Sequence, residues 1–540
     1  MDNTKSFYLL NMGSIPVGRT SYNSGFGEMD IILVFETSGV GSIPASPANT
    51  QYKYHMNGIL ININQETIFS RGPGAHRIAS ELRSNGWDIE VVDFLLFWSF
   101  DELTQLLRSR INDNTKFIGF SSIFGQWPEL AEKISVWIKT NYPDVVIIYG
   151  TLAYTSLKTK SIDYQFMGFG EAGVLTVLKY LFSNGEPVPY KLVSNGIKLI
   201  QLEGSTPWKN PIIIYEDRDF IQSYEWLGTE FSRGCKFKCD FCTHPYLGVK
   251  GDWHRNTDNF ELQMRDAYDR FGATRYMVSD ETFNDSTEKI TKFANVVEKL
   301  NFEPFFTGFI RPDLLINRGN KELDELSRMR FYGQFYGVES FNHKSAKSVK
   351  KGLHPDKVKE GLLKIKNHFY STNKGYYRGT ISLIAGLPHE TEESILATYD
   401  WLKENWQGEN FLLNPLEIQK LSITDSINSG TSAMALDYAK YGYTEIPEEI
   451  PLDGIYKPFF KQNTVLWQNE HTNYYKVKAL VDSVLNDSMN HDFRIMNFHP
   501  TLWNQDMTIE EILKMKESEF SPWEATTKLA KEYINKKLSI

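Results

Sequence analysis

Short apolar runs alternate with amphipathic segments along the chain from Gly58 onward. The apolar runs lie at 58–64 (GILININ), 89–94 (IEVVDF), 117–122 (FIGFSS) and 145–150 (VVIIYG). Segments with helical periodicity separate them, the first from about Ala75 to a stop signal at Asn85 and Gly86. Strands that alternate with helices predict a parallel sheet covered by helices. With the further strand and helix of IDYQFMGFGEAGVLTVLKYL, residues 56–200 are expected to form a Rossmann-like domain with ligands beyond the carboxyl ends of its strands.

A second series of strands and helices begins near Trp226. The expected strands lie at 228–232, 275–279, 304–309, 333–337, 379–385 and 416–423. Six such repeats predict a partial (β/α)6 barrel of the TIM type over residues 201–425, with its active site at the carboxyl ends of the strands. The expected fold class is therefore α/β, with a Rossmann-like parallel sheet followed by a partial barrel.

The two ends of the chain follow neither pattern. Residues 1–55 are rich in Gly, Ser, Asn and Pro and predict an irregular lead-in with one short strand at 31–35. Residues 426–540 are rich in Tyr, Trp and Asn and predict a mainly helical C-terminal extension, with helices at 508–517 and at the end of the chain. We expect this extension to act as a cap or to face the substrate.

Composition narrows the possible classes of protein. Apolar residues make up 41% of the sequence, a share that is typical of a folded protein. The chain of 540 residues is long enough for several domains. The net charge of −9 gives no global attraction to nucleic acid. Neither a secretory signal nor a run of roughly 20 apolar residues is evident, so the sequence predicts a cytoplasmic protein without membrane contact.

The three cysteines of the chain, Cys235, Cys239 and Cys242, all lie in the segment FSRGCKFKCDFCTHP. Clustered thiolates favour iron–sulfur or zinc chemistry. Three thiolates around a 4Fe-4S cluster leave one iron without a protein ligand, and that iron can bind a cofactor. Zinc is the alternative, because His244 would complete a shell of three thiolates and one imidazole and make the protein a zinc-knuckle binding module. Structural zinc sites usually take ligands from two separated pairs, so the sequence favours the cluster.

The cysteine segment resembles that of the radical S-adenosylmethionine (SAM) superfamily. In that family the open iron binds the amino and carboxylate groups of SAM, and an electron from the cluster cleaves SAM to a 5′-deoxyadenosyl radical. The resemblance implies an enzyme in which Phe241 lies beside the adenine. It also implies an electron donor such as flavodoxin or ferredoxin as partner.

Three further segments extend the resemblance along the expected barrel. YMVSDETFND implies that Asp280 and Glu281 accept hydrogen bonds from the SAM amino group, although these carboxylates could also belong to a helix start, where Asp285 and Ser286 are candidate caps. FYGVESFN implies that Glu339 and Ser340 lie near SAM. GLPHET implies a capped helix start in which Glu390 and Thr391 are structural.

Two arginines and one histidine are expected outside the site. Arg311 and Arg378 could each reach a carboxylate, but we interpret both as solvated charges at strand ends. His76, in the turn RGPGAH at a predicted helix start, is a candidate metal ligand, but we expect it to be a surface or capping residue.

A Rossmann-like domain before this type of barrel resembles the cobalamin-binding subgroup of the superfamily. DYQFMGFGEAGVLTVL and SRGCKFKCDFC carry this resemblance. It implies cobalamin as a further cofactor and methyl transfer to an unactivated carbon as the reaction. The Asp-x-His-x-x-Gly segment that supplies a cobalt ligand in some members is absent here.

Several alternatives remain open at the level of sequence. The first domain could bind no cofactor, in which case the enzyme would catalyse a radical rearrangement, cyclisation or oxidation. The substrate could be a small molecule, a peptide or a nucleobase. With three cysteines in one loop, the chain offers no thiolates for an auxiliary cluster, which argues against methylthio transfer.

Overall fold

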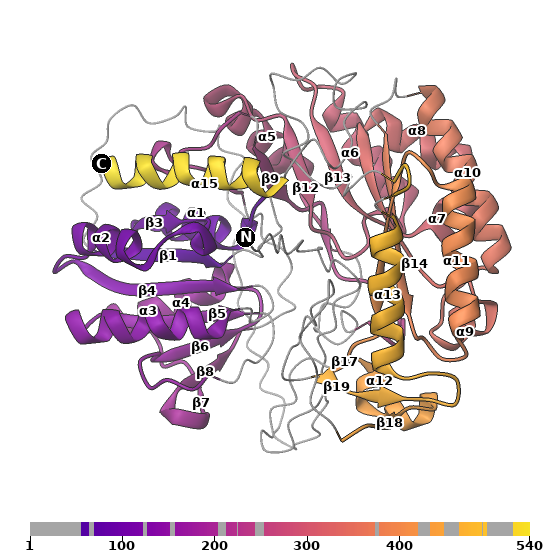
Figure 1. The fold of residues 1–540 in the computed structure, drawn as a ribbon. Helices are drawn as coiled ribbons and strands as arrows, with labels where there is room; N and C mark the ends of the chain where they lie inside the picture. The colour runs from indigo at the N-terminus through magenta and orange to yellow at the C-terminus, as the bar shows by residue number, and fades with distance from the viewer. Residues whose placement is uncertain are drawn as a thin grey trace, which may run out of the picture.

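The computed structural model contains two lobes, each built on a seven-stranded sheet (Figure 1). The structure describes residues 56–63, 70–122, 127–151, 157–202, 212–223, 225–242, 253–372, 377–419, 432–447, 464–488, 490–493 and 522–540. The strand expected at 31–35 and the helix expected at 508–517 lie outside these residues. Within them, no helix is long and apolar enough to cross a membrane.

The first lobe has the strand order β3-β1-β4-β5-β6-β8-β7, parallel except for the edge strand β7. Its strands are β1 (Asn57–Ile63), β3 (Asp88–Val92), β4 (Thr115–Ser122), β5 (Val146–Thr151), β6 (Tyr164–Met167), β7 (Lys191–Leu192) and β8 (Lys198–Gln201). Its helices are α1 (Pro73–Ser84), α2 (Phe100–Arg110), α3 (Pro128–Asn141) and α4 (Glu171–Phe182). Strand β1 lies between β3 and β4, so the direction in which successive strands are added to the sheet reverses at β1. Doubly wound sheets bind ligands at such a reversal.

Local sequence signals fix the helix ends of this lobe. Pro73 and Pro128 begin α1 and α3, where proline loses no intrahelical hydrogen bond. Ser99 caps α2 in a reciprocal pair with Glu102. The expected stop of α1 is confirmed, since Asn85 is its C-cap and Gly86 has φ +83°.

The second lobe, the barrel lobe, has the parallel strand order β16-β15-β14-β13-β12-β9-β2. Its strands are β2 (Ser70–Arg71), β9 (Trp226–Thr229), β12 (Arg275–Val278), β13 (Phe305–Ile310), β14 (Phe331–Glu339), β15 (Arg378–Ala385) and β16 (Asn410–Pro415). Its helices are α5 (Thr257–Phe271), α6 (Thr287–Val297), α7 (Pro312–Arg318), α8 (Asn320–Arg328), α9 (His343–Ser348), α10 (Pro355–Thr372) and α11 (Glu392–Asn405). The two parallel sheets and the helical elements that follow them confirm the expected fold class.

The edge strand β2 comes from the segment between β1 and α1 of the first lobe. It pairs in parallel with β9, opposite Trp226 and Leu227. A Cβ on Gly228 would lie 2.6 Å from Pro73 Cδ and 2.9 Å from the Arg71 carbonyl oxygen, so this approach requires glycine. The first lobe therefore joins the barrel sheet by backbone hydrogen bonds as well as by side chains.

The sixth barrel strand is not where the sequence predicted it. We expected residues 416–423, where apolar and polar positions alternate, but β16 is Asn410–Pro415. A parallel strand buried on both faces reads as a continuous apolar run, as in Phe411 to Leu413, rather than as an alternation. Part of the expected strand, β17 (Ile418–Gln419), instead pairs antiparallel with β19 (Thr464–Val465).

The described parts of the C-terminal region pack on both lobes. Helix α13 (Tyr474–Ser488) packs on β16 and α11 of the barrel lobe, whereas α15 (Pro522–Ser539) lies along the first lobe (Figure 1). The shorter elements α12 (Ala433–Leu436), β18 (Thr444–Glu445) and β20 (Trp467–Gln468) lie beside α13. Leu529, Tyr533 and Ile534 of α15 are buried in the core of the first lobe. The described parts of the region expected to act as a cap or to face the substrate are thus divided between the two lobes.

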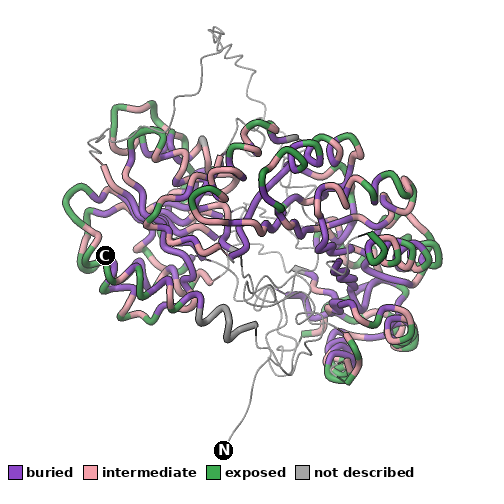
Figure 2. The backbone as a smooth tube through the Cα atoms, turned by 90° about the horizontal axis from the view of Figure 1, so that it is seen from above, coloured by how far each residue is buried: buried purple, intermediate pink, exposed green. Residues whose placement is uncertain are grey.

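Burial follows the sheets (Figure 2). The central strands of both sheets are mostly buried, the edge strand β7 is exposed, and the outer faces of the helices carry many of the exposed residues. The carboxyl ends of both sheets face the space between the lobes, where the functional residues lie.

Candidate active site between the two sheets

One cavity of about 390 Å³ is bordered by the carboxyl ends of both sheets. From the barrel lobe it is lined by all three cysteines and by Phe241, Asp280, Glu281, Arg311, Glu339, Lys351 and Ser382, among others. From the first lobe it is lined by residues at the ends of β4 and β5, at the start of α1 and in the turn before α4. The cavity thus lies at the strand ends of both sheets, where the sequence predicted ligands to bind.

The cysteine loop leaves the barrel directly after β10 (Ser232–Arg233), which pairs with β11 (Trp253–His254). Gly234 turns the chain with φ +97°, and its N–H donates to the Glu281 carboxylate at 3.0 Å. The Cys235 thiol lies 3.1 Å from the Thr282 hydroxyl. None of the three cysteines forms a disulfide, and burial raises the pKa of the Cys235 thiol. Three reduced thiols therefore face one cavity.

The two metal sites considered from the sequence require different separations between the three sulfurs. A zinc ion holds each sulfur at about 2.3 Å, so its ligands must converge on one point. Among the described residues, no three His, Cys, Asp or Glu side chains converge closely enough to hold a single metal ion. A cuboidal cluster binds each cysteine to a different iron and separates the sulfurs more widely. The three free thiols that line one cavity supply the donor set of a 4Fe-4S cluster with one open iron, and His244, the fourth ligand of the zinc alternative, lies outside the described residues.

Asp280 and Glu281 lie together at the end of β12 but have different surroundings. Asp280 is buried and accepts hydrogen bonds from the Phe231 N–H at 2.8 Å and from the Ser232 hydroxyl at 2.7 Å. Burial raises the pKa of Asp280 to about 7, although Lys289 acts in the opposite direction. Both carboxylates line the cavity, and both also hold the backbone that leads into the cysteine loop. Of the two candidate caps, Ser286 is confirmed as the N-cap of α6, and Asp285 pairs with Lys289.

Glu339 and Ser340 are neighbours in sequence, but the structure separates their surroundings. Glu339 lines the cavity with φ +71°, and its Oε1 lies 3.2 Å from Lys351 Nζ. Its Oε2 is buried without a hydrogen-bond partner. Ser340 is not among the described residues that line the cavity and donates to Glu390 at 2.5 Å.

The turn before α11 is structural, as its sequence predicted. Glu390 accepts the N–H groups of Gly386 and Leu387, and Thr391 caps α11. Burial raises the pKa of Glu390 to about 7. Ser340 therefore supports this turn.

The prediction that Arg311 and Arg378 are solvated was wrong for both. Arg311 lines the cavity, and its Nη1 lies 3.5 Å from the Cys239 sulfur. Arg378 is buried at the amino end of β15 and donates to the Tyr377 carbonyl at 2.6 Å. A position at the end of a predicted strand does not reveal whether the surrounding structure encloses the side chain, and it encloses both arginines.

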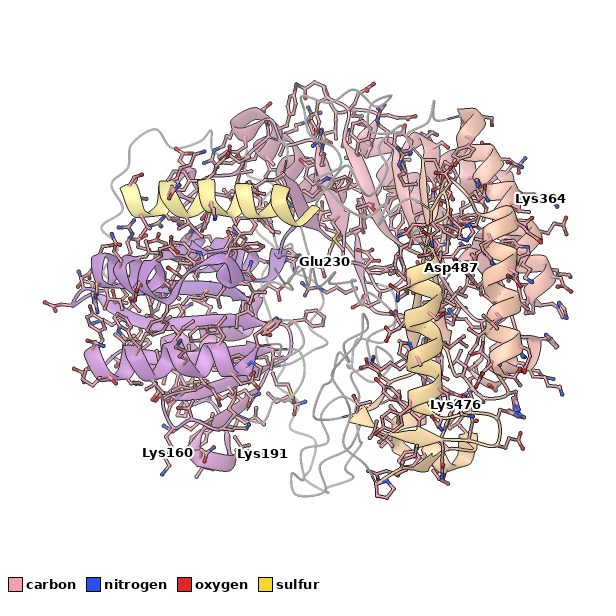
Figure 3. All side chains as sticks on the ribbon, in the orientation of Figure 1. Lys160, Lys191, Glu230, Lys364, Lys476 and Asp487 are labelled. Atoms are coloured by element: carbon pink, nitrogen blue, oxygen red, sulfur yellow. The ribbon has the colours of Figure 1, made fainter. Side chains whose placement is uncertain are left out.

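A network of four alternating charges joins the lobes beside the cavity, and sequence analysis missed it. Arg77 of α1 contacts Glu230 at 2.6 Å and Glu171 at 3.3 Å, and Arg233 contacts Glu171 at 2.5 Å and Glu230 at 3.1 Å. Figure 3 shows Glu230 at the junction of the lobes. Burial acts to raise the pKa of Glu171, but Arg233 and Arg77 lower it to about 2. The Glu of the Gly-Phe-Gly-Glu turn and the Arg before Cys235 thus bind each other.

His76 is neither a surface residue nor a cap. It is fully buried, its Nε2 lies 2.9 Å from Asp93 Oδ2, and it is not among the described residues that line the cavity. Arg71 contacts the same carboxylate at 2.6 Å and binds Glu225 through two further hydrogen bonds. The hydroxyl of Tyr533 accepts the Asp93 N–H at 3.0 Å. His76 therefore belongs to a buried network that holds α15 against the first lobe.

The first-lobe side of the cavity is formed by glycines and apolar side chains. Gly119 and Gly150 lie in β4 and β5, and Gly168 and Gly170 lie in the turn before α4. A Cβ on Gly150 would meet only the Phe120 carbonyl oxygen, at 3.4 Å. Arg77 and Glu171 are the charged residues among the described lining of this lobe, and they pair with each other. This edge offers room for a bulky ligand and has little charge.

Comparisons with known proteins agree with this arrangement. Residues 229–402 match the model of the radical SAM superfamily. A candidate methylthiotransferase of Methanocaldococcus jannaschii is 27% identical over 343 residues, which cover 61% of this chain and 71% of that protein.

Two solved structures share the two-lobed fold. The methyltransferase TsrM from Kitasatospora setae, a radical SAM enzyme solved with cobalamin and a [4Fe-4S] cluster, aligns with a TM-score of 0.62 over 88% of this chain and 99% of that chain, at 11% identity. The cobalamin-dependent SAM radical enzyme OxsB aligns with a TM-score of 0.50 over 85% of this chain and 64% of that chain, at 14% identity. Residues 229–402 are thus similar to the radical SAM superfamily, and the fold of the chain resembles that of the cobalamin-binding subgroup.

Proposed function

We propose that the protein is a cobalamin-dependent radical SAM methyltransferase that acts on an unactivated carbon. The observation that carries the proposal is the single cavity that joins three thiols at the barrel edge to a glycine-lined edge of the first sheet. Enzyme chemistry at the barrel follows from the superfamily, whereas the cofactor of the first lobe and the methyl acceptor are proposals.

The residues of the barrel edge would have distinct roles. Cys235, Cys239 and Cys242 would ligate a 4Fe-4S cluster, which when bound supplies the electron that cleaves SAM to methionine and a 5′-deoxyadenosyl radical. A flavodoxin or ferredoxin would provide that electron. The unpartnered Oε2 of Glu339 is a ready acceptor for the ammonium group of SAM, and Phe241 offers an aromatic face for its adenine.

The glycine-lined edge of the first lobe would hold cobalamin, which when bound supplies a methyl-carrying cobalt. TsrM and OxsB, whose folds this chain shares, are described with cobalamin bound. In this chain, the described residues that line the cavity include no histidine, so no imidazole from them reaches the cavity as a cobalt ligand. We propose that the first lobe holds the macrocycle by shape rather than by a metal–protein bond.

Methyl transfer fits the chain better than methylthio transfer, despite the description of the Methanocaldococcus relative. Methylthio transfer of the kind considered above needs an auxiliary cluster with its own cysteine ligands. The chain has three cysteines, and all three belong to one loop.

Corrinoid retention tests the proposed function. Protein reconstituted anaerobically with iron, sulfide and hydroxocobalamin should keep about one corrinoid per chain after gel filtration. Retention of cluster without corrinoid would favour the cobalamin-free rearrangement, cyclisation or oxidation. Zinc in place of iron would indicate a binding protein.

A further inference from the structure

Arg311 is held in one orientation at the cluster side of the cavity. Its Nε donates to Asp313 Oδ1 at 3.1 Å and its Nη2 donates to Asp313 Oδ2 at 2.8 Å. The plane of the guanidinium lies over the Phe237 ring at 3.7 Å. Asp313 binds the edge of the guanidinium that carries Nε and Nη2. The remaining nitrogen, Nη1, therefore faces the Cys239 sulfur at 3.5 Å.

The backbone of Arg311 is fixed as well. The Asn284 side chain accepts the Arg311 N–H at 2.9 Å and donates to the Arg311 carbonyl at 2.9 Å. The side chain of Arg311 is 11% exposed, so little water competes for its hydrogen bonds. A rigid donor of this kind, aimed at one sulfur, is more than the solvated charge that the sequence suggested.

We propose that Arg311 is a positioning residue that acts through Cys239 to raise the reduction potential of the cluster. This inference rests on the proposed function, because it needs the thiolate of Cys239 bound to iron. One-electron reduction by an external donor adds negative charge to the cluster and its sulfurs. An N–H donor at a sulfur stabilises that charge, and hydrogen bonds to cluster sulfurs are among the factors that set such potentials.

Asp313 gives the inference its sharpest test. The carboxylate neutralises the guanidinium, so its removal leaves an uncompensated positive charge beside the sulfur. Arg311→Gln should therefore shift the midpoint potential to more negative values, and Asp313→Asn should shift it to more positive values. A purely structural role would not produce shifts of opposite sign.

The experiment is an EPR-monitored redox titration of the reconstituted protein, with iron content measured for each variant. Arg328→Gln is the matched control, since Arg328 lies on α8, pairs with Glu298 and Glu325, and is not among the described residues that line the cavity. Its midpoint potential should equal that of the wild type. Arg311→Lys provides a second variant if Arg311→Gln takes up less iron, and it should also shift to more negative values because an ammonium cannot bind Asp313 as a fork and donate to Cys239 at once.

Two outcomes would overturn the inference, and they are distinguishable. Wild-type protein without a reducible 4Fe-4S signal would overturn the proposed function together with this inference. A normal wild-type signal with unchanged potentials in Arg311→Gln and Arg311→Lys, or with shifts of the same sign in Arg311→Gln and Asp313→Asn, would overturn the inference alone.

Discussion

The two sheets border the same cavity with the same end of their strands, but their edges differ in chemistry. The barrel edge presents three thiols, the carboxylates of Asp280, Glu281 and Glu339, and two cationic side chains. The first-lobe edge presents glycines and apolar side chains, and its Arg77 and Glu171 neutralise each other. The comparison teaches that two parallel sheets of similar size can give the two halves of one cavity different chemistry, one half rich in thiols and charges and the other apolar and lined by glycines.

Replacement of a barrel-edge thiol should have the largest effect. Cys239→Ala should abolish SAM cleavage, because a cluster with two cysteine ligands is not held, while most of the fold remains intact. Iron content and 5′-deoxyadenosine formation measure this effect. His244→Ala is the control and should retain both, and deoxyadenosine formation by Cys239→Ala would contradict the assignment.

Filling the first-lobe edge should affect the other half of the site. Gly150→Leu adds a side chain where a Cβ meets only one backbone atom, so it should fold and reduce corrinoid binding by at least tenfold. SAM cleavage without substrate should continue in this variant. Val136→Leu, on the exposed face of α3, adds bulk away from the cavity and should bind corrinoid normally. Equal loss of iron and corrinoid in Gly150→Leu would show that the two halves are not separable.

Two adjacent residues of the barrel edge should behave differently. Glu339→Gln should weaken SAM binding about tenfold, the expected value for losing a charged hydrogen bond of about 1.4 kcal/mol. Ser340→Ala should leave SAM affinity unchanged and lower the free energy of unfolding by about 1–2 kcal/mol, since it removes a hydrogen bond to buried Glu390. Calorimetric titration with SAM and denaturant unfolding distinguish these outcomes, and a shared loss of affinity would place both residues at the cofactor.

The smallest expected effect is a difference in pH dependence between the lobes. In the first lobe, Arg233 and Arg77 lower the pKa of Glu171, so its contribution to stability is present above about pH 4.5 and is lost as pH falls toward 2. In the barrel lobe, burial raises the pKa of Glu390 to about 7, so stability falls as pH rises from about 5 to 7. Glu390→Gln should reduce the second slope in urea unfolding measured between pH 5 and 8 and leave the part contributed by Asp280, whose pKa burial also raises to about 7. An unchanged slope would show that Glu390 is already ionised in the folded protein.

Sequence patterns predicted those structural features that are determined by residues close together in the chain. The strands β1, β3, β4, β5 and β6 of the first sheet, the first five predicted barrel strands, the cap of α6 and the cysteine loop follow from local runs, turns and caps, whereas β7 and β8 were not predicted. The sixth strand was placed too late because an alternating segment followed the short run that forms β16. The strand β2 was missed because two residues carry no periodicity, and its pairing depends on a lobe far away in sequence.

The site was predicted less completely than the fold, for a related reason. The sequence identified the three cysteines and the cavity residues Phe241, Asp280, Glu281 and Glu339 by resemblance, but it grouped Ser340 with them. It assigned Arg311 and His76 to the surface, because local sequence does not reveal which loops or helices enclose a side chain. His76 is enclosed by contacts with residues as distant as Asp219, while α15 completes the same buried network.

Deoxyadenosine yield is the most direct test of the central claim that the three thiols hold a cluster that cleaves SAM. The protein is purified and reconstituted without oxygen, its iron, sulfide and zinc are quantified, and the same sample is incubated with SAM and dithionite. We expect about four irons per chain, as a cuboidal cluster requires, together with 5′-deoxyadenosine that is absent from Cys239→Ala. Stoichiometric zinc without iron, or a full cluster that never cleaves SAM, would contradict the account.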